Sequence, residues 1–202
     1  MPPRRKRVTM SPQDRREAIV AAGRQVFTST GFSRATMADI AHAADMAQGT
    51  FYLYFDSKEH LLAAVWERYV EGLLEITTRI LDDERDWWPT MDALWSALLE
   101  HAVHNAELHR TVYNSANAKA LELCKQSNRR VVDLICDYVG EGAKAGAFRA
   151  TDPQMACRLT YHAVDGLLDE LIGQDTSLDL PELTRWTTEL VHRALGDPDV
   201  VH

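Results

Sequence analysis

The stretch TMADIAHAADMAQGTFYLYFDSKEHLL, residues 36–62, decides the fold of this chain. Thr36 offers a helix-capping hydroxyl, and Asp39, three residues later, is the acidic half of a capping box. Apolar residues then follow with helical spacing, namely Met37, Ile40, Ala41 and Ala44. Asp45 falls where a turn is needed, because aspartate tolerates left-handed backbone better than most residues. The pattern predicts two short helices joined by a tight turn, and a long helix that starts near Lys58.

Two short helices joined in this way are typical of a DNA-binding helix-turn-helix, whose second helix enters the major groove. Short side chains near the start of that helix read the edges of the bases. Gln48 is the candidate for a bidentate contact with adenine, and Ala47 for an apolar contact with a thymine methyl. Thr50 and Tyr52 could reach either bases or phosphates.

Four other residues are candidates for phosphate contacts that position the protein on DNA: Arg34, Thr36, Tyr54 and Lys58. They supply a guanidinium in a loop, a hydroxyl at a helix N-terminus, a phenol, and an ammonium at the start of the next helix. A structural alternative stays open for the aromatic pair, since either Tyr52 or Tyr54 could belong to the core of a small domain.

The same residues closely resemble the N-terminal domain of the TetR family of bacterial transcriptional regulators. The resemblance covers roughly residues 12–62 and rests on an ungapped series: Thr36, Ile40, Ala41, Ala44, Met46, Ala47, Gly49, Thr50, Phe51, Tyr52, Tyr54, Phe55, Ser57, Lys58, Glu59, Leu61 and Leu62. Asp45 stands where that family usually has Gly, and Ala47 where it often has Ser. The resemblance implies that the candidate positions above are the DNA-contacting ones.

Charge divides unevenly along the 202-residue chain, whose net charge is −8. Residues 1–60 hold nine Lys and Arg against six Asp and Glu, a balance of +3. The remaining residues hold 13 against 24, a balance of −11. DNA phosphates attract the first part and repel the second, so the asymmetry would orient the protein on DNA.

Composition argues against several other classes of protein. No apolar run is long enough to span a membrane and the N-terminus has no apolar signal segment, so we expect a cytoplasmic bacterial protein, on the nucleoid when bound to DNA, with no membrane partner. The cysteines Cys124, Cys136 and Cys157 form no CxxC pair, which argues against a zinc site or a disulfide framework. Phosphate-loop, GxSxG and HExxH motifs are missing, so we expect neither an enzyme nor a cofactor.

No segment alternates with period two, so the chain is predicted to be all-α with roughly nine helices. We expect a flexible basic arm at residues 1–10, which either contacts DNA or is a solvated terminus. A helix-turn-helix DNA-binding domain would follow at 11–57, and a larger helical domain for effector binding and dimerisation at 58–202. Within the latter, a helix at 121–139 is expected to give way to a glycine-punctuated ending at 140–149.

By resemblance, the middle helices enclose a cavity for a small-molecule effector. The polar and aromatic residues there are the candidates to line it: Trp95, Leu98, His101, Tyr113, Cys124, Asn128, Tyr161 and His162. For each of them, core packing or a position on the surface is the alternative. His101 and His104 have a spacing that a metal could use, but without a nearby cysteine or carboxylate cluster no metal site is expected.

One recognition helix spans too few base pairs for specificity, so a homodimer reading a palindromic double-stranded operator is expected. The last two helices, near residues 152–172 and 181–195, carry more apolar surface than a monomer needs, and the resemblance implies that they form a four-helix interface; burial within one chain is the alternative. The expected function is a ligand-responsive dimeric repressor that releases DNA on binding a partly hydrophobic effector. An activator or effector-independent regulator, and more remotely an all-α enzyme using the cavity, are the alternatives.

Overall fold

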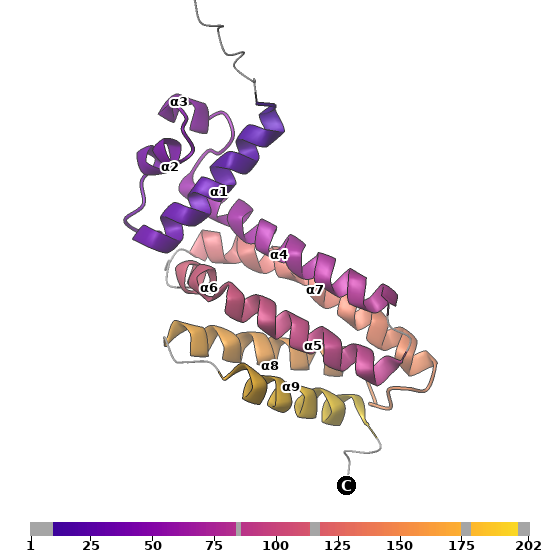
Figure 1. Cartoon of the computed structure of the whole chain (residues 1–202). Helices are drawn as coiled ribbons and strands as arrows, with labels where there is room; N and C mark the ends of the chain where they lie inside the picture. The colour runs from indigo at the N-terminus through magenta and orange to yellow at the C-terminus, as the bar shows by residue number, and fades with distance from the viewer. Residues whose placement is uncertain (1–9, 84–85, 114–117, 175–178, 198–202) are drawn as a thin grey trace, which may run out of the picture. The chain divides into compact units, whose positions relative to one another are not determined.

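The structure is a computed structural model that describes residues 10–83, 86–113, 118–174 and 179–197 (Figure 1). Within these ranges it contains nine α-helices and no strand, which confirms the all-α prediction. The helices are α1 (Pro12–Thr30), α2 (Met37–Ala43), α3 (Gln48–Phe51), α4 (Lys58–Asp83), α5 (Trp87–His104), α6 (Ala106–Tyr113), α7 (Ala118–Lys144), α8 (Pro153–Gly173) and α9 (Leu180–Leu195).

The helices form two compact units, divided between Val65 and Trp66. The first, called the head, holds α1, α2, α3 and roughly the first two turns of α4. The second, called the body, holds the rest of α4 and α5 to α9. One continuous helix, α4, therefore begins in the head and ends in the body.

The head is built on α1 and a small aromatic core. Ser11 caps α1 by accepting a hydrogen bond from the Asp14 amide at 3.0 Å, and Pro12 takes the first helical position. Gly23 in α1 lies so close to α4 that a Cβ there would come within 2.6 Å of Leu61 Cδ2. The buried side chains of the head are Ile19, Val20, Ala22, Val26, Phe27, Phe32, Ala35, Ile40, Ala41, Phe51, Phe55, Leu61, Leu62, Ala64 and Val65.

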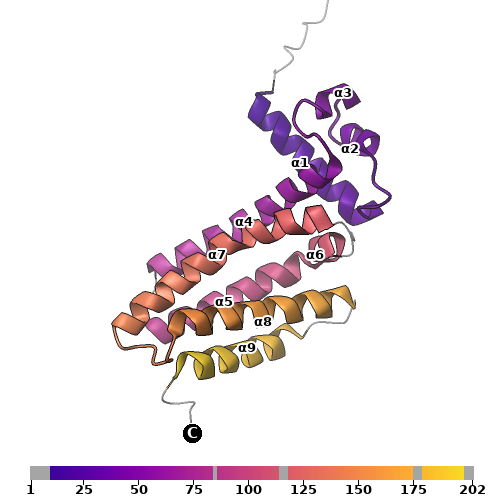
Figure 2. The same ribbon diagram turned by 180° about the vertical axis from the view of Figure 1, so that it is seen from behind.

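The body is a helical bundle in which α8 packs against α6, α7 and α9, while α9 also packs against α5 (Figure 2). Trp66 Nε1 in α4 donates a hydrogen bond to Asn128 Oδ1 in α7 at 2.9 Å, which ties these two helices together. The largest fully buried side chains of the body are Trp66, Met91, Leu94, Leu99, Leu108 and Ile135. None of the described helices is long and apolar enough to cross a membrane.

One predicted boundary is wrong, because α7 does not end at residue 139 but continues through Gly140 and Gly142 to Lys144. A Cβ at Gly142 would lie 2.4 Å from the Phe148 ring and 2.9 Å from that of Trp87. The missing side chain therefore allows two aromatic rings to pack on the helix. The glycines here mark a close approach rather than a helix end.

Candidate functional site

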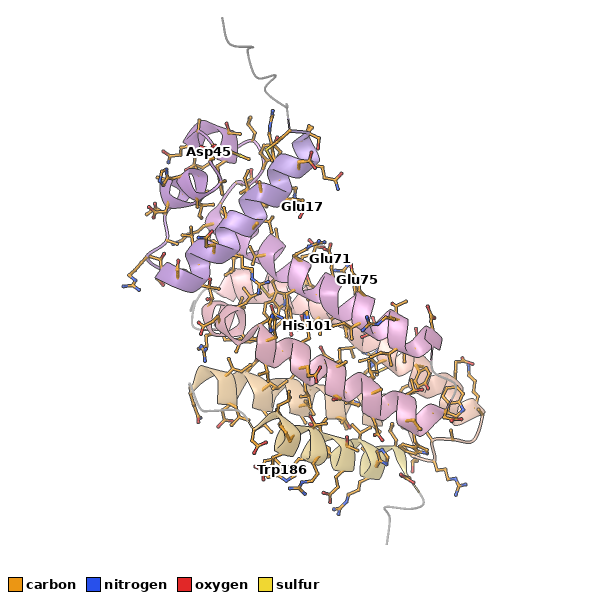
Figure 3. All side chains as sticks on the ribbon, viewed as in Figure 1. Glu17, Asp45, Glu71, Glu75, His101 and Trp186 are labelled. Atoms are coloured by element: carbon orange, nitrogen blue, oxygen red, sulfur yellow. The ribbon has the colours of Figure 1, made fainter. Side chains whose placement is uncertain are left out.

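The turn of the helix-turn-helix has the backbone that the sequence predicts. Thr36 Oγ1 accepts a hydrogen bond from the Asp39 amide at 3.2 Å, and Asp39 Oδ2 accepts from the Thr36 amide at 3.0 Å, which completes the capping box. Hydrogen bonds from the Thr36 hydroxyl and backbone lower the pKa of the Asp39 carboxyl. Asp45, between α2 and α3 (Figure 3), has a left-handed φ of 53°.

Helix α3 is a single turn whose inner and outer sides differ sharply. Phe51 is fully buried and packs against Phe55, with the two rings tilted and 5.8 Å between their centroids. Gln48 is exposed, and the side chains of Tyr52 and Leu53 are 53% and 79% exposed. The buried Phe51 ring fixes the orientation of this turn. The large exposed side chains beside it therefore form a surface that can contact a partner.

The other predicted DNA-contacting residues belong to α3, to the residues that flank it, and to the loop between α1 and α2. Ala47 caps α3 without a side-chain hydrogen bond and is exposed. Thr50 and Tyr54 are half-buried, so Tyr54 is the less accessible of the two tyrosines. Arg34 is exposed, and its Nε donates to the carbonyl oxygen of Thr30 at 2.9 Å.

Lys58 has a different environment from the other candidates. Its Nζ donates to the carbonyl oxygens of Phe32 at 2.8 Å and of Ser33 and Ala35 at 3.3 Å. Three donors and three acceptors leave the ammonium satisfied by the loop between α1 and α2. This geometry favours a residue that positions the loop over one that contacts phosphate.

Leu53 is the exposed residue of this surface that the sequence reasoning missed. Leu53 lies between Tyr52 and Tyr54 but is not one of the residues on which the resemblance rests. An apolar residue next to a helix is normally assigned to the core. Its 79% exposure is the signal that only the structure supplies.

The body contains two hollows that share the side chains of Tyr161 and Asp165 in their walls. The first, called the deep cavity, has a volume of about 30 Å³ and is lined by Tyr69, Leu73, Trp95, Leu98, Leu99, Ala102, His109, Tyr161, Val164, Asp165 and Leu168. The second, called the groove, has a volume of about 570 Å³ and is lined by Tyr113, Lys125, Asn128, Arg129, Val132, Asp133, Arg158, Tyr161, His162, Asp165, Gly166 and Asp169.

Polar side chains from three helices are joined beside these hollows. His109 of α6 is buried, with its Nε2 2.9 Å from the hydroxyl of Tyr69 in α4 and its Nδ1 3.1 Å from Asp169 Oδ1 in α8. Burial raises the pKa of the hydroxyls of Tyr69, Tyr113 and Tyr161, which therefore stay protonated at neutral pH. The imidazole thus connects the wall of the groove to the long helix α4.

Most of the predicted ligand-binding residues fall in these walls. Trp95 and Leu98 line the deep cavity, Tyr161 lines both hollows, and Tyr113, Asn128 and His162 line the groove. The structure separates the other two from them. His101 lines a different hollow with His104, and its Nε2 lies 3.3 Å from the carbonyl oxygen of Tyr69. Cys124 is buried and lines neither of the two shared-wall hollows, and burial raises its pKa to about 12.

Four titratable residues of the site are not among the candidates that the sequence analysis names. Tyr69, His109, Asp165 and Asp169 come from three helices, and their contacts depend on how those helices pack. The available signal was the spacing of Asp165 and Asp169, which places two carboxylates on one side of an otherwise apolar helix. Among the described residues, no group of three or more His, Cys, Asp and Glu side chains is arranged to hold a metal ion.

The head matches a known family of proteins. Residues 19–65 match the family described as "Bacterial regulatory proteins, tetR family". The uncharacterized HTH-type transcriptional regulator YvdT of Bacillus subtilis (strain 168) is 37% identical over 78 residues, 39% of this chain, and the chain spans 40% of the length of that protein. The fatty acid metabolism regulator protein of the same strain is 24% identical over 185 residues, 86% of this chain and 91% of that protein.

The whole chain also has the fold of a solved regulator. The transcriptional regulator FadR from Bacillus subtilis, in complex with stearoyl-CoA, superposes with a TM-score of 0.76 at 18% identity and covers 92% of this chain and 99% of that one. At this identity the likeness concerns the fold. The match across residues 19–65 shows that this chain carries the helix-turn-helix domain of the tetR family of bacterial regulatory proteins.

Proposed function

We propose that this protein is a dimeric, ligand-responsive transcriptional repressor, without catalytic activity, that binds a palindromic operator and leaves it when a small effector occupies the body. DNA reading is assigned to residues 11–57, and effector binding and dimerisation to residues 58–202. The basic arm at residues 1–10 is proposed as a further DNA contact, and its residues 1–9 lie outside the described ranges.

The observation that carries the DNA-binding part is the exposed surface formed by α3 and the two residues that follow it. Gln48, Tyr52 and Leu53 project from a turn that the buried Phe51 anchors. Gln48 can form a bidentate contact with adenine, and Leu53 and Ala47 offer apolar contacts to thymine methyls. We assign phosphate contacts to Thr50, Tyr54, Thr36 and Arg34.

Exposed apolar side chains on α8 and α9 support the dimer. Five of the large hydrophobic residues with high exposure lie on these two helices: Met155, Leu159, Leu167, Trp186 and Leu190. Figure 3 shows Trp186 on the outer surface of α9, where it is 51% exposed. A second copy of the same pair of helices would bury these side chains and place two recognition helices on one DNA duplex.

The polar link from the groove to α4 supports the response to a ligand. Asp169 lines the groove, His109 contacts it, and Tyr69 in α4 contacts the same imidazole. A ligand that contacts Asp169 competes with His109 for this carboxylate. His109 also contacts Tyr69 in α4, and this helix begins at Lys58 in the head. By linkage, an effector that weakens DNA binding must itself bind less tightly to the DNA complex.

Selection of binding sites from random DNA with the purified full-length protein tests this function. We expect a palindromic consensus whose half-sites are about one helical turn apart. Gln48→Ala and Tyr52→Ala should each weaken binding to that site by about 1–3 kcal/mol with unchanged thermal unfolding. The exposed Ser33→Ala is the matched control in the same unit. If the selected sites contain no palindrome, the proposal of a dimeric repressor is contradicted.

Repression and activation are separated by a reporter gene placed behind the selected site. A repressor lowers expression when it is present, and the effector restores expression. If adding the protein increases expression, the protein is an activator and not a repressor. The assignment of the DNA-binding surface would not change.

A further inference from the structure

The two hollows of the body differ in size in a way that limits what they can hold. The groove, with about 570 Å³, can accept a small organic molecule. The deep cavity, with about 30 Å³, has room for a group of about the size of one water molecule. A long acyl chain therefore does not fit the inner end, whereas a hydroxyl, ether or carbonyl oxygen does.

Asp165 stands in the wall that the two hollows share, and no residue in the described ranges forms a salt bridge with it. No hydrogen bond to this carboxylate is formed by the described residues, whereas its neighbour Asp169, one helical turn away, contacts His109. Burial, and then the charge of Asp169, raise the pKa of Asp165 to about 6. At neutral pH a partly desolvated anion thus faces the space where a ligand would sit.

The positive groups around the groove that the structure describes form no ion pair with this anion. Arg158 donates to Asp133 at 2.8 Å, which neutralises both. Lys125 and Arg129 are exposed side chains on α7; Lys125 lowers the pKa of Asp165 through its charge but makes no salt bridge to it. On α6, His109 is held between Asp169 and Tyr69, and on α8, His162 is exposed. The inner wall is therefore acidic, and the cations lie towards solvent.

Aromatic side chains surround the same space and include an unused donor. Tyr69 and Trp95 line the deep cavity, Tyr113 lines the groove, and Tyr161 lines both. Aromatic faces attract organic cations. Trp95 is 3% exposed, and its Nε1–H is one of the buried side-chain donors for which the described residues offer no acceptor. A buried donor of this kind is costly unless something accepts its hydrogen bond.

We propose that the effector is an organic cation, a protonated amine or quaternary ammonium on an aromatic or alicyclic body, whose positive charge lies beside Asp165 and Asp169. An oxygen of the same molecule reaches the deep cavity and accepts the hydrogen bond of Trp95. This proposal rests on the effector role proposed above, and it names the chemistry of that effector. The cation would balance the charge of Asp165 and compete with His109 for Asp169.

Calorimetric titration of the full-length protein without DNA tests the cation. The probes are (4-methoxybenzyl)trimethylammonium, the neutral 4-methoxybenzyl alcohol, which keeps the ring and the ether oxygen, and stearoyl-CoA. We expect the cation to bind and the alcohol to bind about tenfold or more weakly. Asp165→Asn and Asp169→Asn should each weaken the cation about tenfold or more, whereas Asp165→Glu should keep binding. Asp137→Asn, an exposed carboxylate on α7, is the charge control.

Three results would overturn the cation proposal: no binding of the cation at millimolar concentration, equal binding of the alcohol, or cation binding that survives both asparagine variants. Circular dichroism of each variant shows that it is folded. A gel shift with the selected operator then separates this proposal from the proposed function. If the cation binds in a way that depends on Asp165 but the affinity for DNA does not change, the cation site is supported and its role as the effector site is contradicted. If stearoyl-CoA releases the DNA and the cation does not, the proposed response to a ligand is supported and the proposal of a cationic effector is contradicted.

Discussion

Lys58 Nζ lies 2.8 Å from the carbonyl oxygen of Phe32 and 4.6 Å from the centre of the Phe32 ring. The first residue of α4 is thereby tied to the loop that follows α1. A charge-assisted hydrogen bond and a cation–π contact act between the same two residues. This loop also carries Arg34 and Thr36, so Lys58 orders two of the candidate phosphate contacts.

Lys58→Met should lower the free energy of unfolding by about 1–3 kcal/mol, because it removes hydrogen bonds from a charged donor and leaves carbonyl oxygens without it. Chemical denaturation of the full chain measures the change. Arg34→Ala is the matched variant: its exposed guanidinium should matter little for stability, but its loss should weaken DNA binding uniformly and reduce the salt slope by about 1. Unchanged stability of Lys58→Met, with a reduced salt slope, would instead make Lys58 a phosphate contact.

Asp45→Gly should raise the melting temperature, because Asp45 has a left-handed φ of 53° that costs a residue with a Cβ up to about 1 kcal/mol. Asp45→Ala should lower it by a similar amount. Ala43→Gly, at the exposed end of α2, is the control and should destabilise by about 1 kcal/mol, since glycine is unfavourable within a helix. A lower melting temperature for Asp45→Gly would show that the aspartate side chain itself stabilises the turn.

Asp165→Asn should stabilise the protein at pH 8, and the gain should shrink as the pH falls towards 4. The pKa of Asp165 is about 6 in the folded protein and near its ordinary 3.8 in the unfolded chain. The folded state therefore binds this proton more tightly, and the contribution of this group to stability falls as the pH rises from 4 through 6. At pH 8 the raised pKa lowers the free energy of unfolding of the wild type by at most about 3 kcal/mol.

Thermal unfolding of the wild type and Asp165→Asn across this pH range measures the difference, and Asp137→Asn serves as the control. A stabilisation that stays constant from pH 8 to 4 would mean that Asp165 keeps an ordinary pKa.

Trp186→Glu and Leu190→Glu should convert a dimer into a monomer. Both side chains are exposed on α9, so the charged replacements are tolerated in a single chain but are buried and unpaired in the proposed interface. Sedimentation analysis measures the mass in solution. Arg185→Glu, an exposed neighbour on the same helix, is the comparison for a change of charge. A wild-type protein that is monomeric at micromolar concentration would exclude the dimer.

Local patterns determined the helices and the turn. Thr36 and Asp39 predicted the capping box, Asp45 the left-handed turn, and Ser11 with Pro12 the start of α1, and each of these is found in the structure. Such features depend on residues within three or four positions of each other, so their chemistry can be read directly from the order of the side chains. The exposed Leu53 and the helical Gly142 show the limit of this local reasoning.

The contacts among the buried polar side chains of the body depend on how the helices pack. Tyr69, His109 and Asp169 lie 40 and 60 residues apart along the chain, yet the imidazole contacts both oxygens. Lys58 likewise has the sequence of a phosphate contact, but tertiary structure directs its ammonium to carbonyl oxygens from a loop more than 20 residues earlier. The sequence by itself determined which helices form and that they belong to a DNA-binding regulator. The packing of the helices decided which buried charges meet, because partners distant in the chain become neighbours only in the folded state.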